Sequence, residues 1–349
     1  MVTVYFFNRV KMNRTGIFLF AILCFFQGGY GQTIQGKGQS LSVTDFRGKT
    51  VTLSSPAKRI VCLIESGLTG LYMLGAQNAV VAVPTSAYRE SAASQYAALD
   101  ERIKSHSLST PGNWDFINIE SVVALSPDLV ILWSQQTESI QSLEQKGLSV
   151  YGVFLSRFDD VYKEIRDFGI LTGTSPRAEK LIRYTNEEIG RFSAKPVSTT
   201  VKRPSVYYMW AQGPLETSGT KSTVNELLEL SGAVNVCRSP QEHLVVNAET
   251  VIGWNPEVII MWYNQEKSPA DIMAMAMWRN LSAVKNHRVF ELPSVFYCDL
   301  WTLKFQYAVK MVAAWCYPDR FKTFDLEGER RSMLDTLYGP LGSHLYNDK

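Results

Sequence analysis

Short runs of apolar residues alternate with segments of helical periodicity along most of this 349-residue chain. A run that is apolar at every position predicts a strand buried on both faces, whereas an apolar stripe at helical spacing predicts a helix. The predicted strands are 59–64, 79–83, 129–133 and 149–155 in the first half and 205–210, 258–262 and 288–292 in the second. Because helical segments separate these strands, we expect an α/β fold with mainly parallel sheets.

Two further patterns frame these strands. Residues 43–53 form two short alternating runs around Arg47-Gly48-Lys49, which predicts a small hairpin. Near the middle of the chain, Ser175 can cap a helix that has Pro176 at its first position. The helix has an apolar stripe, which consists of Ala178, Leu181, Ile182, Thr185, Ile189 and Phe192. It is roughly 25 Å long, and it either covers a sheet or connects two lobes.

One segment occurs twice. Residues 119–133 read IESVVALSPDLVILW, and residues 248–262 read AETVIGWNPEVIIMW. In both copies a Glu stands seven residues before a Pro, which is followed by an acidic residue, an apolar run and a Trp. This order predicts a short helix, ended by the Pro, that turns directly into a buried parallel strand. Two copies 129 residues apart indicate two similar lobes.

The two copies place Glu120 and Glu249 at equivalent positions near the start of a helix. Each carboxylate can simply complement the helix N-terminus, which is worth about 0.3–1 kcal/mol. A matched pair, one on each lobe, also suits a partner with two basic sockets. Since exposed ion pairs contribute only about 0–1 kcal/mol each, such contacts would set orientation more than affinity.

With these motifs the chain resembles the substrate-binding proteins of importers for ferric siderophores, haem and cobalamin. The matching segments are DFRGKTVTLSSPAKRIV at 45–61, LYMLGAQNAVVAV at 71–83 and NIESVVALSPDLVIL at 118–132, with a later counterpart at 248–261. The resemblance implies two similar α/β lobes with mainly parallel sheets flanked by helices, joined by one long connecting helix. We expect a signal peptide at 1–31, a first lobe at 32–157, a connecting helical segment at 158–198 and a second lobe at 199–349.

The resemblance also implies a function. The chain would be the exported solute-binding component of an ABC importer that captures an iron chelate, a ferric siderophore, and delivers it to the permease. Cobalamin or another corrinoid, or haem, is the alternative cargo. In that family two glutamates dock on permease arginines, and by position Glu120 and Glu249 would have this role. We expect a monomer without a resident cofactor, because the metal chelate is cargo.

Ligands of parallel sheets bind beyond the carboxyl ends of the strands, and in two lobes these ends face each other across a cleft. The candidates that follow predicted strands are Glu65, Ser66, Tyr88, Trp210, Tyr297, Asp299 and Trp301. Trp114 is added because its spacing from Glu120 resembles that of a tryptophan that packs on cobalamin in the vitamin-binding branch. Tyr263 also follows a strand, and Trp133 and Trp262 are weaker candidates because both belong to the repeat. Arg157, Lys221 and Lys304 could balance an anionic chelate.

In one place the chain departs from the family. Many members have a Thr/Ser-Glu pair in the first helix, where this chain has Thr69-Gly70. Ligand assignments that depend on that helix therefore have less support.

The N-terminal residues and the net charge indicate in which cellular compartment the protein works. Arg9, Lys11 and Arg14 precede an apolar run at 17–26 and the small residues of Gly29-Tyr30-Gly31, which is typical of a secretory signal. Met12 is an alternative start, and acylation of Cys24 would instead anchor the protein at a membrane surface. Without the three basic residues the formal charge falls from +2 to −1, so nothing favours nucleic acid as a partner. We expect a periplasmic protein.

The cysteines, the histidines and the known catalytic motifs give no indication of an active site. Cys62, Cys237, Cys298 and Cys316 match no metal-site spacing, and they are either buried thiols or form one incidental disulfide. The four histidines are not at ligand spacing either. The chain has neither a G-x-S-x-G nor an H-E-x-x-H motif. We therefore expect no enzyme, with a chelatase-like enzyme and a transporter-independent chelate scavenger as rival interpretations.

Overall fold

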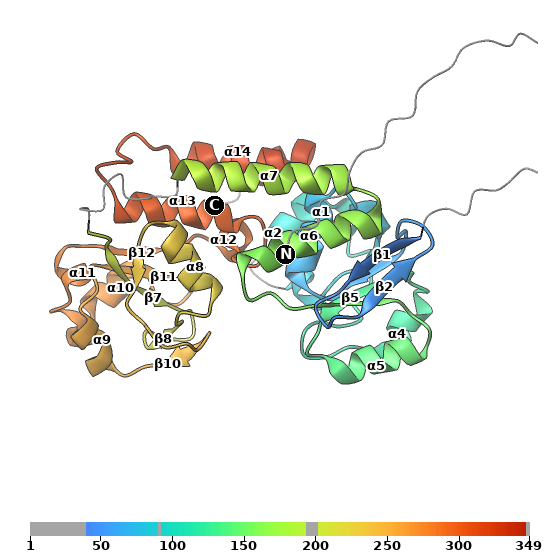
Figure 1. Cartoon of the computed structure of the whole chain (residues 1–349), viewed down its shortest axis with the longest axis horizontal. Coiled ribbons are helices and arrows are strands. Elements are labelled where there is room, and N and C mark those ends of the chain that lie inside the picture. Colours follow the sequence, from blue (N-terminus) through green and yellow to red (C-terminus); the bar gives the residue numbers. More distant parts are fainter. Residues whose placement is uncertain (1–39, 90–91, 193–201, 347–349) are drawn as a thin grey trace, which may run out of the picture. The chain divides into compact units, whose positions relative to one another are not determined.

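Two four-stranded parallel sheets form the framework in the computed structural model, which describes residues 40–89, 92–192 and 202–346 (Figure 1). The first sheet, in spatial order, consists of β4 (Val80–Ala82), β3 (Ile60–Cys62), β5 (Leu129–Trp133) and β6 (Val150–Val153). The second consists of β9 (Val234–Asn235), β7 (Ser205–Met209), β11 (Val258–Met261) and β12 (Val289–Glu291). Both sheets therefore have the same order, with the first strand in sequence between the second and the third. The expected fold class, two similar α/β lobes, is confirmed.

Helices and short turns connect the strands of each lobe. In the first lobe they are α1 (Glu65–Met73), η1 (Gln77–Ala79), η2 (Thr85–Tyr88), α2 (Ala93–Leu99), α3 (Glu101–Lys104), α4 (Ile119–Ala124), α5 (Thr137–Gln145) and α6 (Phe158–Thr172). In the second lobe they are α8 (Thr223–Leu230), α9 (Ala248–Trp254), α10 (Pro269–Ala274), η3 (Ala276–Trp278), α11 (Ser282–Lys285) and α12 (Val295–Cys298). The last helices are α13 (Phe305–Cys316), α14 (Leu326–Tyr338) and η4 (Gly339–Leu345).

The repeated segment has the predicted form in both lobes. In each copy a short helix, α4 or α9, leads through a Pro into the central strand β5 or β11. The side chains of Asn118 and Asn247 cap these helices by accepting a hydrogen bond from the third residue that follows. The residue before each Pro is left-handed, with φ of 46° at Ser126 and 43° at Asn255.

The acidic residue after the Pro has the same structural task in both lobes. Asp128 accepts hydrogen bonds from the backbone N–H groups of Lys58 and Arg59, at the start of β3. Glu257 accepts one from the N–H of Ser205, at the start of β7, at 2.9 Å. In each lobe the carboxylate therefore fixes where the neighbouring strand begins.

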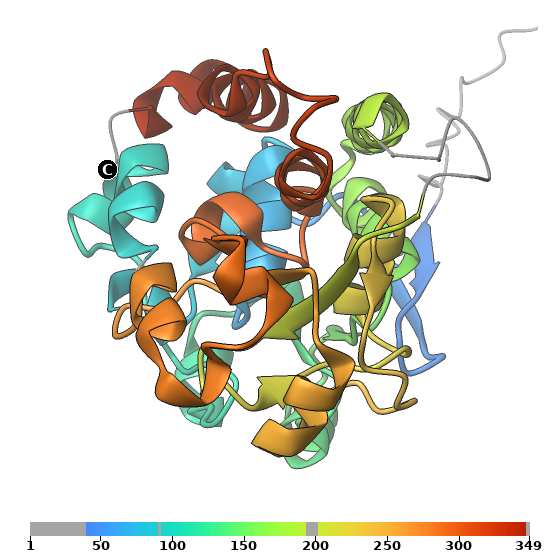
Figure 2. The same ribbon diagram turned by 90° about the vertical axis from the view of Figure 1, so that its left-hand side faces the viewer.

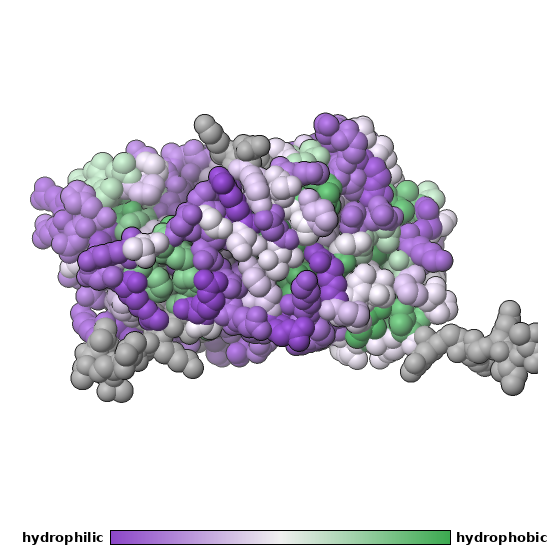
Figure 3. Space-filling model, turned by 90° about the horizontal axis from the view of Figure 1, so that it is seen from above, coloured by the Kyte–Doolittle hydropathy of each residue, from purple (hydrophilic) through white to green (hydrophobic). Residues whose placement is uncertain are grey.

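The connecting helix α7 (Ser175–Phe192) buries the whole predicted stripe. It begins one residue earlier than expected, since Ser175 is its first residue rather than its cap and Thr174 accepts the first backbone hydrogen bonds through its carbonyl. It packs on α6 of the first lobe and on α13 of the second. The helix therefore connects the lobes. Helices α7 and α14 lie along the upper edge of the molecule in Figure 1, and the face seen from that side is mostly hydrophilic (Figure 3).

A second connection between the lobes was not predicted. Helix α14 packs on α1, and η4 packs on α2, so the end of the chain returns to the first lobe. Viewed end on, α13 lies between α7 and α14 (Figure 2). The buried Lys310 of α13 forms ion pairs with Glu188 of α7 and Glu329 of α14. The three helices are therefore held together by charge as well as by apolar packing.

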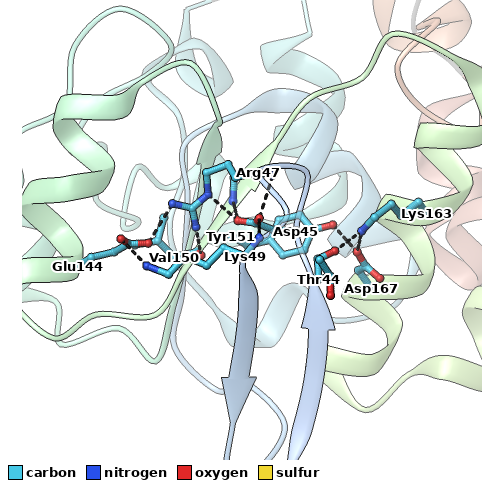
Figure 4. A network of polar contacts seen from close by, with 10 residues as sticks. Thr44, Asp45, Arg47, Lys49, Glu144, Val150, Tyr151, Lys163 and Asp167 are labelled. Carbon is cyan, nitrogen blue, oxygen red and sulfur yellow. Dashed lines mark hydrogen bonds and ion pairs between the residues drawn. The ribbon is translucent and has the colours of Figure 1, made fainter.

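The predicted hairpin consists of β1 (Leu41–Thr44) and β2 (Thr50–Leu53) and is antiparallel. The fully buried carboxylate of Asp45 accepts hydrogen bonds from Arg47 Nε at 2.6 Å and from the Gly152 N–H at 3.0 Å (Figure 4). Arg47 also contacts Glu144 of α5 at 2.9 Å. The DFRGK motif thus fastens the hairpin to β6 and α5, which is a structural role. A second antiparallel pair, formed by β8 (Glu216–Thr217) and β10 (Leu244–Val245), lies in the second lobe.

The expected signal peptide at 1–31, the alternative start at Met12 and the acylation of Cys24 lie outside the described residues. The four other cysteines are buried free thiols and form no disulfide with one another. Of the two interpretations of the sequence, buried thiols or one incidental disulfide, the structure has the first. Across the described part of the chain, no helix is long and apolar enough to cross a membrane.

Candidate functional site

Three adjoining cavities, all lined in part by Trp301, form a cleft between the two sheets. Their volumes are about 210, 140 and 520 Å³. Small-molecule sites usually have volumes of about 300–1,000 Å³. We call these three cavities together the cleft.

The first lobe lines the cleft with residues that follow its strands. Leu63, Ile64, Glu65 and Ser66 come after β3, Ser86 after β4, Gln135 and Gln136 after β5, and Phe154 and Leu155 after β6. The second lobe contributes Trp210, directly after β7. The carboxyl ends of both sheets therefore point into the cleft, as their parallel direction predicts.

Tryptophans form the walls. Trp210 and Trp301 are stacked with ring centroids 6.2 Å apart, and the Trp210 indole N–H donates to the Ser218 hydroxyl at 2.8 Å. On the opposite side Trp133 and Trp114 line two of the three cavities, and 68% of Trp114 is exposed. Rigid rings of this kind provide a large apolar contact area at a low cost in side-chain entropy.

The structure brings six of the eight predicted ligand residues to the cleft. Glu65, Ser66, Trp114, Asp299 and Trp301 line one cavity together, and Trp210 lines the adjoining one.

The other two predicted ligand residues, Tyr88 and Tyr297, line none of the three cavities. Tyr88 stacks on His106, with ring centroids 4.5 Å apart, and donates to the Leu108 carbonyl. Tyr297 is buried and donates to the carbonyl of Leu345 at the end of the chain. Both rings therefore fill packing positions outside the cleft.

The weaker candidates also differ in their placement. Trp133 lines the cleft, but its repeat partner Trp262 is buried against both Trp210 and Trp301, with ring centroids 5.2 and 6.0 Å away. Tyr263 does not line the three cavities.

The basic candidates do not line the cleft either. Arg157 pairs with Glu226 at 3.0 Å and lines a separate cavity. Lys221 is exposed, and Lys304 is buried.

Sequence reasoning missed several cleft residues. Gln135, Gln136 and Phe154 follow β5 and β6, so the strand-end argument could have identified them. Glu242 and His243 lie on the loop before β10, and nothing in their sequence pattern indicates the cleft. Within the described residues, no group of three or more His, Cys, Asp or Glu side chains is arranged to hold a metal ion.

Buried charges lie beneath the cleft. Burial lowers the pKa of Lys304 to about 8, an effect that the nearby carboxylate of Asp299 partly offsets. Burial also raises the pKa of Asp299. Glu164 of α6 is buried, and its pKa is raised well above the usual value by burial and then by repulsion from Asp299 and Asp167. The ammonium of Lys304 lies 3.9 Å from the centroid of the Phe296 ring.

We expect the Glu164→Gln variant to gain stability over the original protein as the pH rises. The pKa of Glu164 is raised in the folded state, so the folding advantage of its protonated form is complete below the unfolded value and is lost as the pH rises through the folded value. Each unit of pKa difference corresponds to about 1.4 kcal/mol. Thermal melting of both proteins between pH 5 and 8 measures the effect.

Glu187→Gln is the matched control, because Glu187 is exposed on the neighbouring helix α7. This variant should melt like the original protein at every pH. A melting difference for Glu164→Gln that does not change with pH would contradict the prediction.

Glu120 and Glu249 each lie in the first turn of the repeated helix, and both are exposed. The carboxylate of Glu120 lies 3.7 Å from the ammonium of Lys146, and 81% of the Glu120 side chain is exposed. The structure therefore presents one accessible carboxylate on each lobe, at equivalent positions.

Comparison with known proteins gives consistent matches. The model of the periplasmic binding protein family matches residues 60–296. The ABC transporter substrate-binding lipoprotein YvrC of Bacillus subtilis is 26% identical over 81% of this chain and 87% of its own length. The vitamin B12-binding protein of Vibrio parahaemolyticus is 24% identical over 69% of this chain and 83% of its own.

Among solved structures, the molybdate-binding protein MolA of Haemophilus influenzae has a similar fold. Its TM-score is 0.72 at 21% identity, over 85% of this chain and 97% of that one.

Proposed function

Because this chain belongs to the periplasmic binding protein family, we propose that it is the substrate-binding component of an ABC importer and captures a bulky metal chelate in its cleft. The observation that carries the proposal is the shared wall of tryptophans at the carboxyl ends of both sheets. It is a binding protein and not an enzyme, in keeping with the family and with relatives that are transporter binding proteins.

The cargo can be a ferric siderophore, a corrinoid or haem. All three present large surfaces that suit aromatic walls. The relative named as a vitamin B12-binding protein favours a corrinoid, and the exposed Trp114 at the edge of the cleft supports a broad, flat ligand.

Delivery requires a partner in the membrane. Glu120 and Glu249 are proposed to contact the permease, since each is exposed on the same helix of its lobe. The protein would work in the periplasm or anchored at a membrane surface, like the relative named as a lipoprotein.

The proposed binding is tested by titrating the purified protein with cyanocobalamin, haem and ferric siderophores. We expect saturable quenching of tryptophan fluorescence by at least one of them. Replacing Trp301 by Ala should weaken that binding about thirtyfold, since a central aromatic anchor is typically worth about 2 kcal/mol or more. The Trp254→Phe variant is the control, because Trp254 packs near Tyr207, outside the cleft. Failure of every chelate to bind would reject the proposal.

A further inference from the structure

The ionisable side chains that line the cleft are mainly acidic. Three carboxylates line it, those of Glu65, Asp299 and Glu242, and Glu242 lines two of its cavities. Among the described residues, no lysine or arginine lines any of the three cavities. His243 lines one cavity, but its ring already contacts the Glu216 carboxylate at 2.6 Å. An anion that left water for this cleft would therefore lose hydration without gaining a lysine or arginine as its partner.

In their observed positions, the lysine and arginine side chains considered as candidates cannot pair with an anionic ligand in the cleft. Lys304 is 1% exposed beneath the cleft, where Asp299 and Glu65 already oppose its charge. Arg157 is paired with Glu226 at the other cavity. Lys221 is exposed and does not line the cleft, although it precedes Ser222, which does.

The three carboxylates of the cleft only accept hydrogen bonds when ionised, whereas the amides and hydroxyls that line it, such as those of Gln135 and Gln136, can both donate and accept. An ionised carboxylate has no donor, so it is suited to N–H groups of a ligand. The Ser66 hydroxyl, in a residue that is 5% exposed and lines the cleft, has no hydrogen-bond partner among the described residues. The faces of Trp114, Trp133 and Trp301 carry partial negative charge, which attracts cations and the edges of N–H groups.

From this arrangement we infer that the cargo is a neutral or cationic metal chelate with amide N–H groups at its periphery, and that multiply anionic chelates are selected against. The inference rests on the proposed function and narrows its ligand class. A similar fold does not fix the charge of the ligand, since sites vary within one fold.

Three chelates of different charge test the inference by tryptophan quenching at pH 7. They are neutral cyanocobalamin, cationic ferrioxamine B and the multiply anionic ferric complex of a tricatecholate siderophore. We expect at least one of the first two to bind at least tenfold more tightly than the anionic complex. Tightest binding of the anionic complex would overturn the charge class and leave the proposed function standing. If none of the three binds but haem does, the charge class also fails, and if no chelate binds, the proposed function fails with it.

A charge change in the wall provides a second test. Glu242→Lys should lower the affinity for the favoured chelate at least tenfold and raise the affinity for the anionic complex. The control is Glu266→Lys, because Glu266 is exposed on the same lobe and lines none of the three cavities. It should change neither affinity. Circular dichroism confirms that both variants fold, and equal effects of the two substitutions would contradict a local role of Glu242.

Discussion

Replacing both Glu120 and Glu249 by alanine is expected to reduce uptake of the chelate to less than about a tenth, with its affinity for the purified protein unchanged. Both carboxylates are exposed and outside the cleft, so we expect ligand binding not to involve them. Charged groups at an interface mainly set the encounter rate and the orientation of the partners. Uptake of labelled chelate by cells that carry the importer measures the effect.

The fold should tolerate this double substitution. The caps Asn118 and Asn247 stay in place, and the lost interaction with each helix N-terminus is worth about 0.3–1 kcal/mol. A matched control is the pair Glu138→Ala and Glu266→Ala, which also removes one exposed carboxylate from each lobe. Full uptake by the Glu120 and Glu249 double variant would reject the docking role. It would then favour a chelate scavenger that works without a transporter.

Replacing Lys310 by methionine is expected to lower the free energy of unfolding by about 3–5 kcal/mol, the usual cost of breaking a buried ion pair from one side. Lys310 is fully buried, and its ammonium contacts Glu188 and, at 2.6 Å, Glu329. Burial acts to raise the pKa of Glu188, but hydrogen bonds from Lys310 and Arg191 lower it. Without Lys310, two carboxylates between three helices would lose their main partner. Urea unfolding followed by circular dichroism measures the loss.

Two comparison variants make this prediction specific. Lys322→Met removes an exposed lysine that pairs with Asp319 at 2.9 Å, and it should leave the urea midpoint of unfolding unchanged, because exposed ion pairs contribute little to stability. Adding Glu188→Gln and Glu329→Gln to Lys310→Met should recover part of the loss, because these side chains, which keep only Arg191 as a basic partner, then carry no charge. A Lys310→Met protein within about 1 kcal/mol of the original would show that the network does not hold the helices together.

The sequence predicted the framework because its signals are local. A run such as 129–133 is apolar at every position and only five residues long, which favours a strand covered on both faces, and the segment is such a strand. Each copy of the repeat, 119–133 and 248–262, is 15 residues long and predicts a helix, a turn and a strand in that order. Both copies fold that way. The strand-end argument then selected Ser66, Trp210 and Trp301, and all three line the cleft.

The sequence could not separate residues of the same type that have different surroundings. Trp133 and Trp262 occupy the same position in the repeat, yet Trp133 lines the cleft and Trp262 is buried against two other tryptophans, Trp210 and Trp301. The difference comes from Trp301, a residue far along the chain. Tyr297 was expected in the cleft for a local reason, but the returning end of the chain covers it and accepts its hydrogen bond.

The sequence by itself determined that this protein has two like lobes, because hydrophobic periodicity and a repeated motif are properties of neighbouring residues. Only the tertiary structure decided the charge of the cleft and the tie between the lobes. Nothing in the sequence around Lys304 and Lys310 distinguishes them from exposed lysines, yet both side chains are buried. Whether a charged side chain is buried depends on partners such as Asp299, Glu188 and Glu329, which distant elements bring to it.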